Sequence, residues 1–260
     1  MENSSLCKLF EEEKIEYFSI LPFCSDDVIN IRLLPEAASS VIVFLIPYRT
    51  DREEKNPLAH FARIRDYHGF AKELFLKLIP KLCSLYPESE FHGFADHSPF
   101  NERALAKKGG LGSIGKNGLL INEKYGSYVF IGEIITTAKL ESRILPQKEL
   151  CSNCGLCGKA CPKKEECISA ISQRKRKTEE DLMLLRETNT VWGCDICQEI
   201  CPLNKKAFLS PFEYFYKGKI SDFSDIITMD DSAFNSYSFS YRGRKTITEN
   251  IQNISKKDID

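Results

Sequence analysis

Two runs of cysteine constrain this chain more than any other feature of its sequence. Cysteine stands at positions 151, 154, 157 and 161 in the first run, at 194, 197 and 201 in the second, and at 167 between them. Proline follows the last cysteine of each run, at Pro162 and Pro202. The first spacing is that of bacterial ferredoxins, in which three thiolates hold one [4Fe-4S] cluster and the fourth binds a second cluster.

The eight cysteines therefore predict two [4Fe-4S] clusters. The second run has the last three cysteines of the ferredoxin pattern, and Cys167 is available as the missing ligand. In the crossed arrangement, the first cluster takes Cys151, Cys154, Cys157 and Cys201, and the second takes Cys161, Cys167, Cys194 and Cys197. Zinc is one alternative, but zinc sites use four ligands, usually as two separated Cys-x2-Cys pairs, and need no proline after each run.

Disulfides are the other alternative, and they require an oxidising compartment. The segment 1–18 is acidic and lacks the basic region and apolar stretch of a signal peptide. The longest aliphatic run, Val41–Ile46, has the length of a buried strand and not the ~20 residues of a membrane span. We expect a cytoplasmic monomer without a membrane partner, with Cys7, Cys24 and Cys83 as small buried residues.

Charge is unevenly distributed along the chain. The 260 residues have a net charge of −1, which excludes a uniformly basic nucleic-acid binder. Two basic runs stand out nevertheless, made of Arg174, Lys175, Arg176 and Lys177 and of Arg242, Arg244 and Lys245. Such runs are usually solvated surface, but they are also the candidates for phosphate contacts.

Residues 1–150 have the pattern of a mixed α/β domain. Apolar runs predict buried strands at 40–46 and 128–135 and a short extended segment at 91–95. Apolar spacing predicts a helix at 68–85, with Phe70, Leu74, Leu76, Ile79 and Leu82 on its buried face. A second helix at 101–108 would take Ser98 as N-cap and Pro99 as first residue, and a third is predicted at 179–187.

A glycine-rich segment follows the helix at 101–108. Gly110-x4-Gly115-Lys116 resembles a phosphate-binding P-loop, but Asn117 stands where that motif has serine or threonine. The segment also follows a helix, whereas a P-loop follows a strand. Nucleotide binding is therefore disfavoured, and the glycines indicate tight turns or close approach of the backbone to a ligand.

Several segments together resemble the epoxyqueuosine reductase family. They are NERALAKKGGLGSIGKNGLLINEKYGSYVFIGEIITT at 101–137, CSNCGLCGKACP at 151–162, GCDICQEICPLNK at 193–205, FARIRDYH at 61–68 and YRGRKTITEN at 241–250. The resemblance implies a cobalamin-binding domain of α/β (α+β sandwich) type at 1–146 and a two-cluster ferredoxin-like domain at 147–204. Residues 205–260 would be a polar tail packing on both, anchored by Phe212, Tyr214, Phe215 and Tyr216.

The resemblance also implies an activity, the reduction of epoxyqueuosine to queuosine in tRNA. An external low-potential donor would reduce the first cluster, and the second would pass electrons to cobalamin. The family's acid falls on Asp96, which would protonate the oxygen released from the epoxide; such an acid needs a pKa raised by burial. The alternative is that Asp96 only caps the turn beside Ser98. The remaining cobalamin contacts implied are Leu120, Ile131, Ile134, Ser169, Asp195 and Ile196.

Two departures from the family pattern define alternatives. The helical-repeat extension that many members carry after the RGRK segment is missing from the sequence, and only five residues separate Cys161 from Cys167. We therefore expect a short form of the enzyme. A corrinoid-dependent reductase of a small molecule is the first alternative, and a non-enzymatic iron–sulfur electron carrier is the second.

Overall fold

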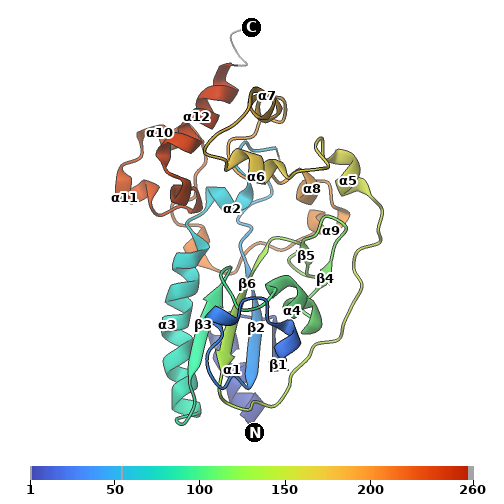
Figure 1. The fold of residues 1–260 in the computed structure, drawn as a ribbon, viewed down its shortest axis with the longest axis vertical. Coiled ribbons are helices and arrows are strands. Elements are labelled where there is room, and N and C mark those ends of the chain that lie inside the picture. Colours follow the sequence, from blue (N-terminus) through green and yellow to red (C-terminus); the bar gives the residue numbers. More distant parts are fainter. Residues whose placement is uncertain (1, 54, 257–260) are drawn as a thin grey trace.

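A four-stranded antiparallel sheet forms the centre of the N-terminal half of the molecule (Figure 1). The structure is a computed structural model that describes residues 2–53 and 55–256. The strands are β1 (Phe18–Pro22), β2 (Ser40–Pro47), β3 (Phe91–Ala95) and β6 (Val129–Thr136), in the order β1-β2-β6-β3. The three predicted strands are confirmed to within one residue, whereas β1 was not predicted. The mixed α/β class is thus confirmed.

Helices cover both faces of this sheet. α1 (Glu2–Glu12) and α3 (Tyr67–Leu85) pack on one face, and α4 (Glu102–Lys108) packs on the other. Successive side chains of a strand point to opposite faces, so Phe44 of β2 contributes to the first core and Val43 to the second. Because both faces of the central strands are buried, their sequences show no alternation of apolar and polar residues.

α3 confirms the helix predicted at 68–85, with one error in its buried face. Leu74, Leu78 and Leu82 are buried at intervals of four residues and face the sheet. Leu76 was assigned to this face but is 68% exposed. The assignment was wrong because Leu76 lies on the side of the helix turned away from the sheet.

The predicted start of α4 was also wrong. Its N-cap is Asn101, whose side chain accepts a hydrogen bond from the Ala104 amide at 3.2 Å. Ser98 instead donates from its hydroxyl to Glu133 in β6, and accepts from the Phe100 amide at 3.1 Å. Ser98 therefore ties the loop before α4 to the sheet.

The cysteine-rich segment folds into short helices. They are α5 (Leu156–Ala160), α6 (Ile168–Ser172), α7 (Glu179–Glu187), α8 (Ile196–Glu199) and α9 (Pro202–Lys205). Cys167 directly precedes α6, and Cys201 directly precedes α9, where Pro202 occupies the first helical position. α7 is confirmed as predicted, and its N-terminus has a capping box formed by Thr178 and Asp181.

The C-terminal segment forms an apolar core of its own, which the expectation of a polar tail missed. Its elements are the 3-10 helices at Glu213–Phe215 and Ser238–Arg242 and the α-helices α10 (Asp225–Thr228), α11 (Asp231–Phe234) and α12 (Arg244–Ser255). Phe239 and Ile247 pack there against Leu58 and the fully buried Trp192. The segment thus contacts both preceding regions, while the predicted domain boundaries stay a prediction.

Smaller elements complete the chain. α2 (His60–Arg63) precedes α3, two 3-10 turns lie at Ser25–Asp27 and Ile31–Leu33, and a short hairpin pairs β4 (Ser113–Ile114) with β5 (Leu120–Ile121). In Figure 1 this hairpin lies directly below α8 and α9. Within the described residues, no helix combines the length and apolar character needed to cross a membrane.

Candidate functional site

A cavity of about 130 Å³ lies where β3 ends, beside the first turns of α3 and α4. Its wall combines apolar and titratable side chains. The lining residues are Tyr67, Asp96, Glu102, Arg103, Leu119, Leu120, Ser127, Val129, Phe130 and Ile131. Three of the predicted cobalamin contacts, Asp96, Leu120 and Ile131, therefore line the same cavity.

Asp96 occupies the turn that follows β3. Its backbone lies in the left-handed region at φ +65°, and the His97 amide donates to the Ala95 carbonyl at 2.8 Å across it. Aspartate tolerates this region better than most residues. The carboxylate is 65% exposed, lies 3.8 Å from Nε2 of His68 and shares the cavity wall with Tyr67. The turn thus presents the carboxyl group to the cavity, while Asn101 caps the next helix.

Two further carboxyl groups, those of Glu102 and Glu133, lie near this turn. Glu102 lies near Asp96, and burial together with the Asp96 charge raises its pKa to about 7. Glu133 is 1% exposed, and burial raises its pKa to about 7 as well. It accepts the hydrogen bond from Ser98. Carboxyl groups that titrate near neutral pH are typical of functional sites.

A buried polar network joins the cavity to the second cysteine run. The Ser127 hydroxyl donates to Oε1 of Gln198 at 2.8 Å, and the Ser127 amide donates to Oδ1 of Asn204 at 2.8 Å. Nδ2 of Asn204 donates to the Gln198 carbonyl at 2.8 Å. Since Gln198 follows Cys197 in α8, these bonds fix the cysteine-bearing helix against the cavity wall. Leaving one such buried group without its partner costs about 1–3 kcal/mol.

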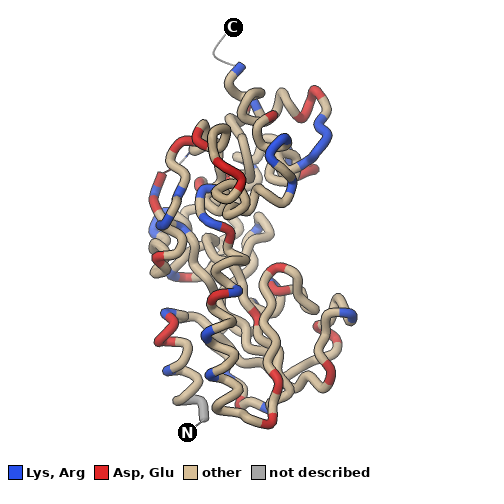
Figure 2. Tube along the Cα trace, turned by 90° about the vertical axis from the view of Figure 1, so that its left-hand side faces the viewer, with Lys and Arg blue, Asp and Glu red and all other residues tan. Residues whose placement is uncertain are grey.

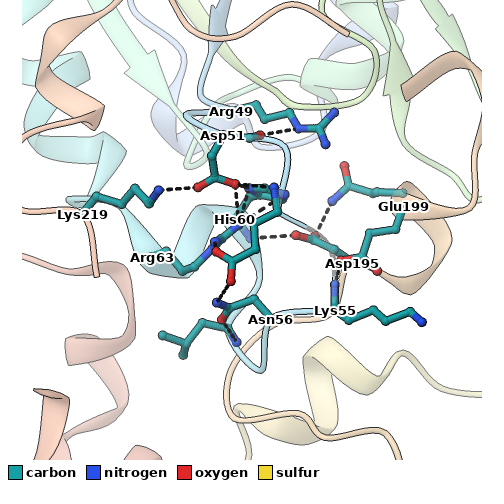
Figure 3. Close-up of polar contacts among 12 residues, drawn as sticks. Arg49, Asp51, Lys55, Asn56, His60, Arg63, Asp195, Glu199 and Lys219 are labelled. Atoms are coloured by element: carbon teal, nitrogen blue, oxygen red, sulfur yellow. Dashed lines mark hydrogen bonds and ion pairs between the residues drawn. The ribbon is translucent and has the colours of Figure 1, made fainter. Parts of the chain in front are cut away.

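Asp195 anchors the same run to α2 (Figure 3). Its carboxylate accepts from the His60 amide at 2.7 Å and from Nε2 of Gln198 at 2.6 Å. Burial raises the pKa of Asp195 to about 6. The side chain that was expected to approach a corrin is therefore buried and directed toward α2, and it lines a different cavity from that of Asp96.

The C-terminal segment also contacts the residues that surround His60. Burial and the neighbouring Arg63 lower the pKa of His60 to about 3, so its imidazole is neutral at neutral pH. Asp51 pairs with Arg63 at 3.3 Å and with Lys219 of the C-terminal segment at 2.5 Å (Figure 3). The turn that carries the second cysteine run therefore packs against a set of paired charged side chains.

The structure brings cysteines of the two runs close together. α5, which carries Cys157, packs against α8, which carries Cys197. Burial and the nearby Asp195, Cys197 and Cys167 raise the pKa of Cys194 to about 12. Burial and the charges of Asp195, Cys167 and Cys157 raise the pKa of Cys197 to about 11. All eleven cysteines are free thiols. Thiols crowded in this way become stable thiolates only beside positive charge, such as a metal.

The described residues contain no group of three or more His, Cys, Asp or Glu placed to bind one metal ion. A [4Fe-4S] cluster has a different requirement, because each of its four thiolates binds a different iron. Cys167, Cys194 and Cys197, which lie within electrostatic range of one another, suit that wider spacing.

Four of the predicted cobalamin contacts, Ile134, Ser169, Asp195 and Ile196, do not line the Asp96 cavity. Ile134 is fully buried in the core beneath α3, on the opposite face of β6 from Ile131, so only its backbone is available to a ligand. Ser169 accepts a hydrogen bond from Nε2 of Gln173 at 3.1 Å. Ile196 packs against the small core around α6 and α7.

The two predicted basic segments lie in the part of the molecule near the C-terminal end of the described chain, where Figure 2 shows a continuous stretch of Lys and Arg. The Tyr241 hydroxyl donates to Oε1 of Gln173, which brings the segments at 174–177 and 242–245 together. We refer to the basic side chains of these two neighbouring segments together as the basic surface: Arg174, Lys175, Arg176, Lys177, Arg242, Arg244 and Lys245.

Several side chains of the basic surface are already engaged within the protein. Arg174 donates to both carboxylate oxygens of Asp181, at 3.0 and 2.9 Å, and also to Glu166. Lys177 donates to the Arg174 carbonyl at 2.6 Å, and Arg244 pairs with Asp231 at 3.0 Å. Among the described residues, Lys175, Arg176 and Arg242 are exposed and have no ion pair.

Sequence reasoning missed several residues of the cavity. Tyr67 lies in the FARIRDYH segment, and Glu102 and Arg103 follow the cap of α4. Their positions give a partial signal, since they stand at the start of a helix. Ser127 gives none, because its role depends on Gln198, a partner far away in the sequence.

Comparison with known proteins identifies the family. An epoxyqueuosine reductase of Synechocystis sp. is 33% identical over 194 residues, covering 68% of this chain and 66% of that relative. One of Prochlorococcus marinus is 30% identical over 255 residues, covering 88% of this chain and 80% of that relative. The chain belongs to the epoxyqueuosine reductase family. No protein-family model matches it.

Solved structures of epoxyqueuosine reductases have the same fold. That of Streptococcus thermophilus superposes with a TM-score of 0.78 at 22% identity, covering 97% of this chain and 80% of that one. An epoxyqueuosine reductase solved with an epoxyqueuosine-modified tRNA-Tyr stem loop gives a TM-score of 0.78 at 23% identity, covering 98% and 81%. The architecture of the family thus extends over nearly the whole chain, while the alignment with the Synechocystis protein spans just under two thirds of that relative.

Proposed function

We propose that this chain reduces epoxyqueuosine to queuosine in tRNA, with Asp96 as the proton donor. The observation that carries the proposal is the placement of Asp96 in a cavity with an apolar wall, joined by Ser127 and Gln198 to a cysteine-bearing helix. The site thus combines an acid, an apolar surface and an adjacent candidate electron carrier. Reduction of an epoxide to an alkene takes two electrons and two protons, breaks both carbon–oxygen bonds and releases the oxygen as water. A reductase for this reaction needs these three parts together.

Asp96 would protonate the oxygen that leaves the epoxide carbon. Its side chain is 65% exposed, so the chain alone does not desolvate it, and a ligand covering the cavity would have to do so. His68 is placed to return the proton. Its Nε2 lies 3.8 Å from Asp96, and the hydrogen bond from its Nδ1 to Asp66 raises its pKa, so that it carries a proton nearer to neutral pH.

The cysteines would hold two [4Fe-4S] clusters, with Cys167, Cys194 and Cys197 in the second. The closeness of Cys167, Cys194 and Cys197 to one another supports a shared cluster there, because a [4Fe-4S] cluster is held by four cysteine thiolates. An external low-potential donor would load the first cluster.

Leu120 and Ile131 would contact cobalamin at the apolar wall. The cavity of about 130 Å³ is smaller than the ~300–1,000 Å³ of a typical ligand site. It would therefore receive only the reacting end of a ligand, and the remainder would lie over its rim. When bound, cobalamin supplies a strongly reducing centre. The chain supplies the apolar wall, the acid and the path from the cysteines.

Anaerobic reconstitution tests the proposal. The protein is loaded with iron, sulfide and cobalamin, and turnover is measured on an epoxyqueuosine-containing tRNA stem loop. We expect about eight irons, one bound cobalamin and formation of queuosine. Cobalamin binding without turnover would indicate the small-molecule reductase instead. Clusters without cobalamin would indicate the electron carrier.

The basic surface would contact tRNA phosphates through its unpaired side chains. Replacing Lys175, Arg176 and Arg242 together by alanine should weaken stem-loop binding and lower the slope of log affinity against log salt by about 2–3, since each phosphate contact contributes roughly 0.7–0.9. Fluorescence anisotropy over a salt series measures both quantities.

A control with the same loss of charge uses three exposed lysines elsewhere, Lys8, Lys72 and Lys139. Their joint replacement by alanine should leave the slope unchanged. An equal loss of slope in both triple variants would mean that binding responds to net charge and not to the basic surface.

A further inference from the structure

Several segments that are far apart in the sequence meet beside the first cysteine run. α5 packs against α8, and α8 packs against α9, so these three helices form one group (Figure 1). The loop between β4 and β5 adjoins them, because a Cβ atom added to Gly155 would lie 4.0 Å from Nζ of Lys116. The Leu150 amide also donates to Oγ of Ser113, in β4, at 3.1 Å. The helices and the loop therefore form one continuous part of the molecule.

Large apolar side chains are exposed in this part of the molecule. Leu156, which directly precedes Cys157, is 37% exposed. Ile200 and Leu203 stand on the two sides of Cys201, and each is 38% exposed. The three side chains therefore flank ligands that are predicted for one cluster, the first. Exposed apolar side chains that gather in one place mark interaction sites more often than single ones do.

Positive charge accompanies these apolar side chains. The segments 109–122, 150–162 and 200–211 contain no aspartate and no glutamate. Their lysines are all exposed and have no ion pair within the described part of the chain: Lys116, Lys159, Lys205 and Lys206. The chain as a whole has a net charge of −1, so this excess is local. It fits a partner whose own surface is negative.

We propose that this surface docks a small acidic one-electron carrier protein, which reduces the first cluster. We call it the donor surface: Leu156, Lys159, Ile200, Leu203, Lys205 and Lys206. The inference rests on the two clusters of the proposed function and names the class of their external donor. In each encounter the carrier loses one electron and the first cluster gains it, so two encounters supply the two electrons of one turnover.

The physical character of the donor surface suits this partner. Complexes that transfer electrons are weak and bury little area, so a few exposed apolar side chains are enough for contact. Opposite charges raise the rate of encounter without requiring a large interface. The basic surface at 174–177 and 242–245 belongs to other segments of the chain, and its assignment to tRNA is tested separately.

The probe for this inference is an acidic plant-type [2Fe-2S] ferredoxin, reduced beforehand. It is mixed with the reconstituted, oxidised full chain, and the second-order rate of cluster reduction is followed by stopped flow and EPR over a salt series. The test variant has Lys159, Lys205 and Lys206 replaced together by alanine. The control is the triple variant of Lys8, Lys72 and Lys139, which loses the same charge elsewhere. Dithionite, a small reductant that needs no docking surface, is used in parallel, and iron content is measured in each protein.

At low salt the ferredoxin should reduce the clusters of the test variant about tenfold more slowly, the lower end of the roughly 10–10³-fold range for electrostatic steering. The difference should shrink as salt rises, because exposed charges are screened. Dithionite rates and iron content should stay unchanged. Leu203→Ser should slow the reaction at high salt as well, since salt does not screen an apolar contact.

Equal ferredoxin rates in the test variant and the unmodified chain would overturn the inference. Equal slowing in the control variant would do so too, since it would mean a response to net charge. Weaker stem-loop binding by the test variant with an unchanged ferredoxin rate would assign the surface to tRNA instead. Clusters that dithionite reduces but the ferredoxin does not would remove the docking surface and leave the proposed function standing. Absence of clusters from the unmodified chain would refute the cofactors of the proposed function, and this inference with them.

Discussion

Asp96→Asn should lose turnover on epoxyqueuosine-containing tRNA by about 10²–10⁴-fold, the usual contribution of a positioned acid. Asparagine has nearly the same shape as aspartate and also tolerates the left-handed backbone found at this position. The hydrogen bond from the His97 amide to the Ala95 carbonyl, which closes the turn, does not involve the Asp96 side chain, so the turn is retained. What asparagine lacks is the acidic proton. The rate of a single turnover by pre-reduced protein should fall, while iron content and stem-loop affinity should stay unchanged.

The matched control is Asp26→Asn, an exposed aspartate in the loop after β1. It should turn over at the unmodified rate. Equal rates for Asp96→Asn and the unmodified chain would contradict the assigned role and would leave Asp96 as a turn residue only. A raised stem-loop dissociation constant with an unchanged single-turnover rate would assign Asp96 to binding.

The sheet could be predicted because its signals are local. Residues 41–46 are apolar without alternation, and 129–135 are apolar apart from Gly132 and Glu133, which is the pattern of strands covered on both faces. The C-terminal core could not be predicted in this way. Ile220, Phe239 and Ile247 are scattered among polar residues, and they are buried only because Leu58 and Trp192 lie opposite them. Such a core depends on contacts between distant segments, and sequence periodicity does not report these.

The candidate site likewise contains residues with a local sequence signal and residues without one. Cysteine spacing is a strong local signal, and the resemblance placed the acid at Asp96 because the motif around it is contiguous. Glu133 is different. Its position in β6 becomes meaningful only when Ser98, 35 residues earlier, donates to it. Ile134 shows the converse case: its neighbour Ile135 and Ile131 share one face of the strand while the Ile134 side chain lies on the other, which leaves only its backbone for the predicted contact. A position in a motif does not specify the direction of a side chain.

Substitution of Cys167 should also have a large effect on cluster content and turnover, because Cys167 is the one predicted ligand outside both cysteine runs. Cys167→Ala should reduce the iron content of the reconstituted chain from about eight to about four and remove one of two cluster signals from the EPR spectrum. Turnover should be lost, since electrons would no longer reach the cavity. The physical reason is that three cysteines, Cys161, Cys194 and Cys197, would remain for the second cluster.

A cysteine that is not a predicted ligand provides the control. Cys83 lies in α3 and packs against the main core, so Cys83→Ala should keep about eight irons and near-normal turnover. Iron that stays near eight in Cys167→Ala would mean that another side chain completes the second cluster. Loss of both clusters would mean that Cys167 is needed to fold the whole cysteine-rich segment. Only selective loss of one cluster, with Cys83→Ala intact, supports Cys167 as the fourth ligand of the second cluster.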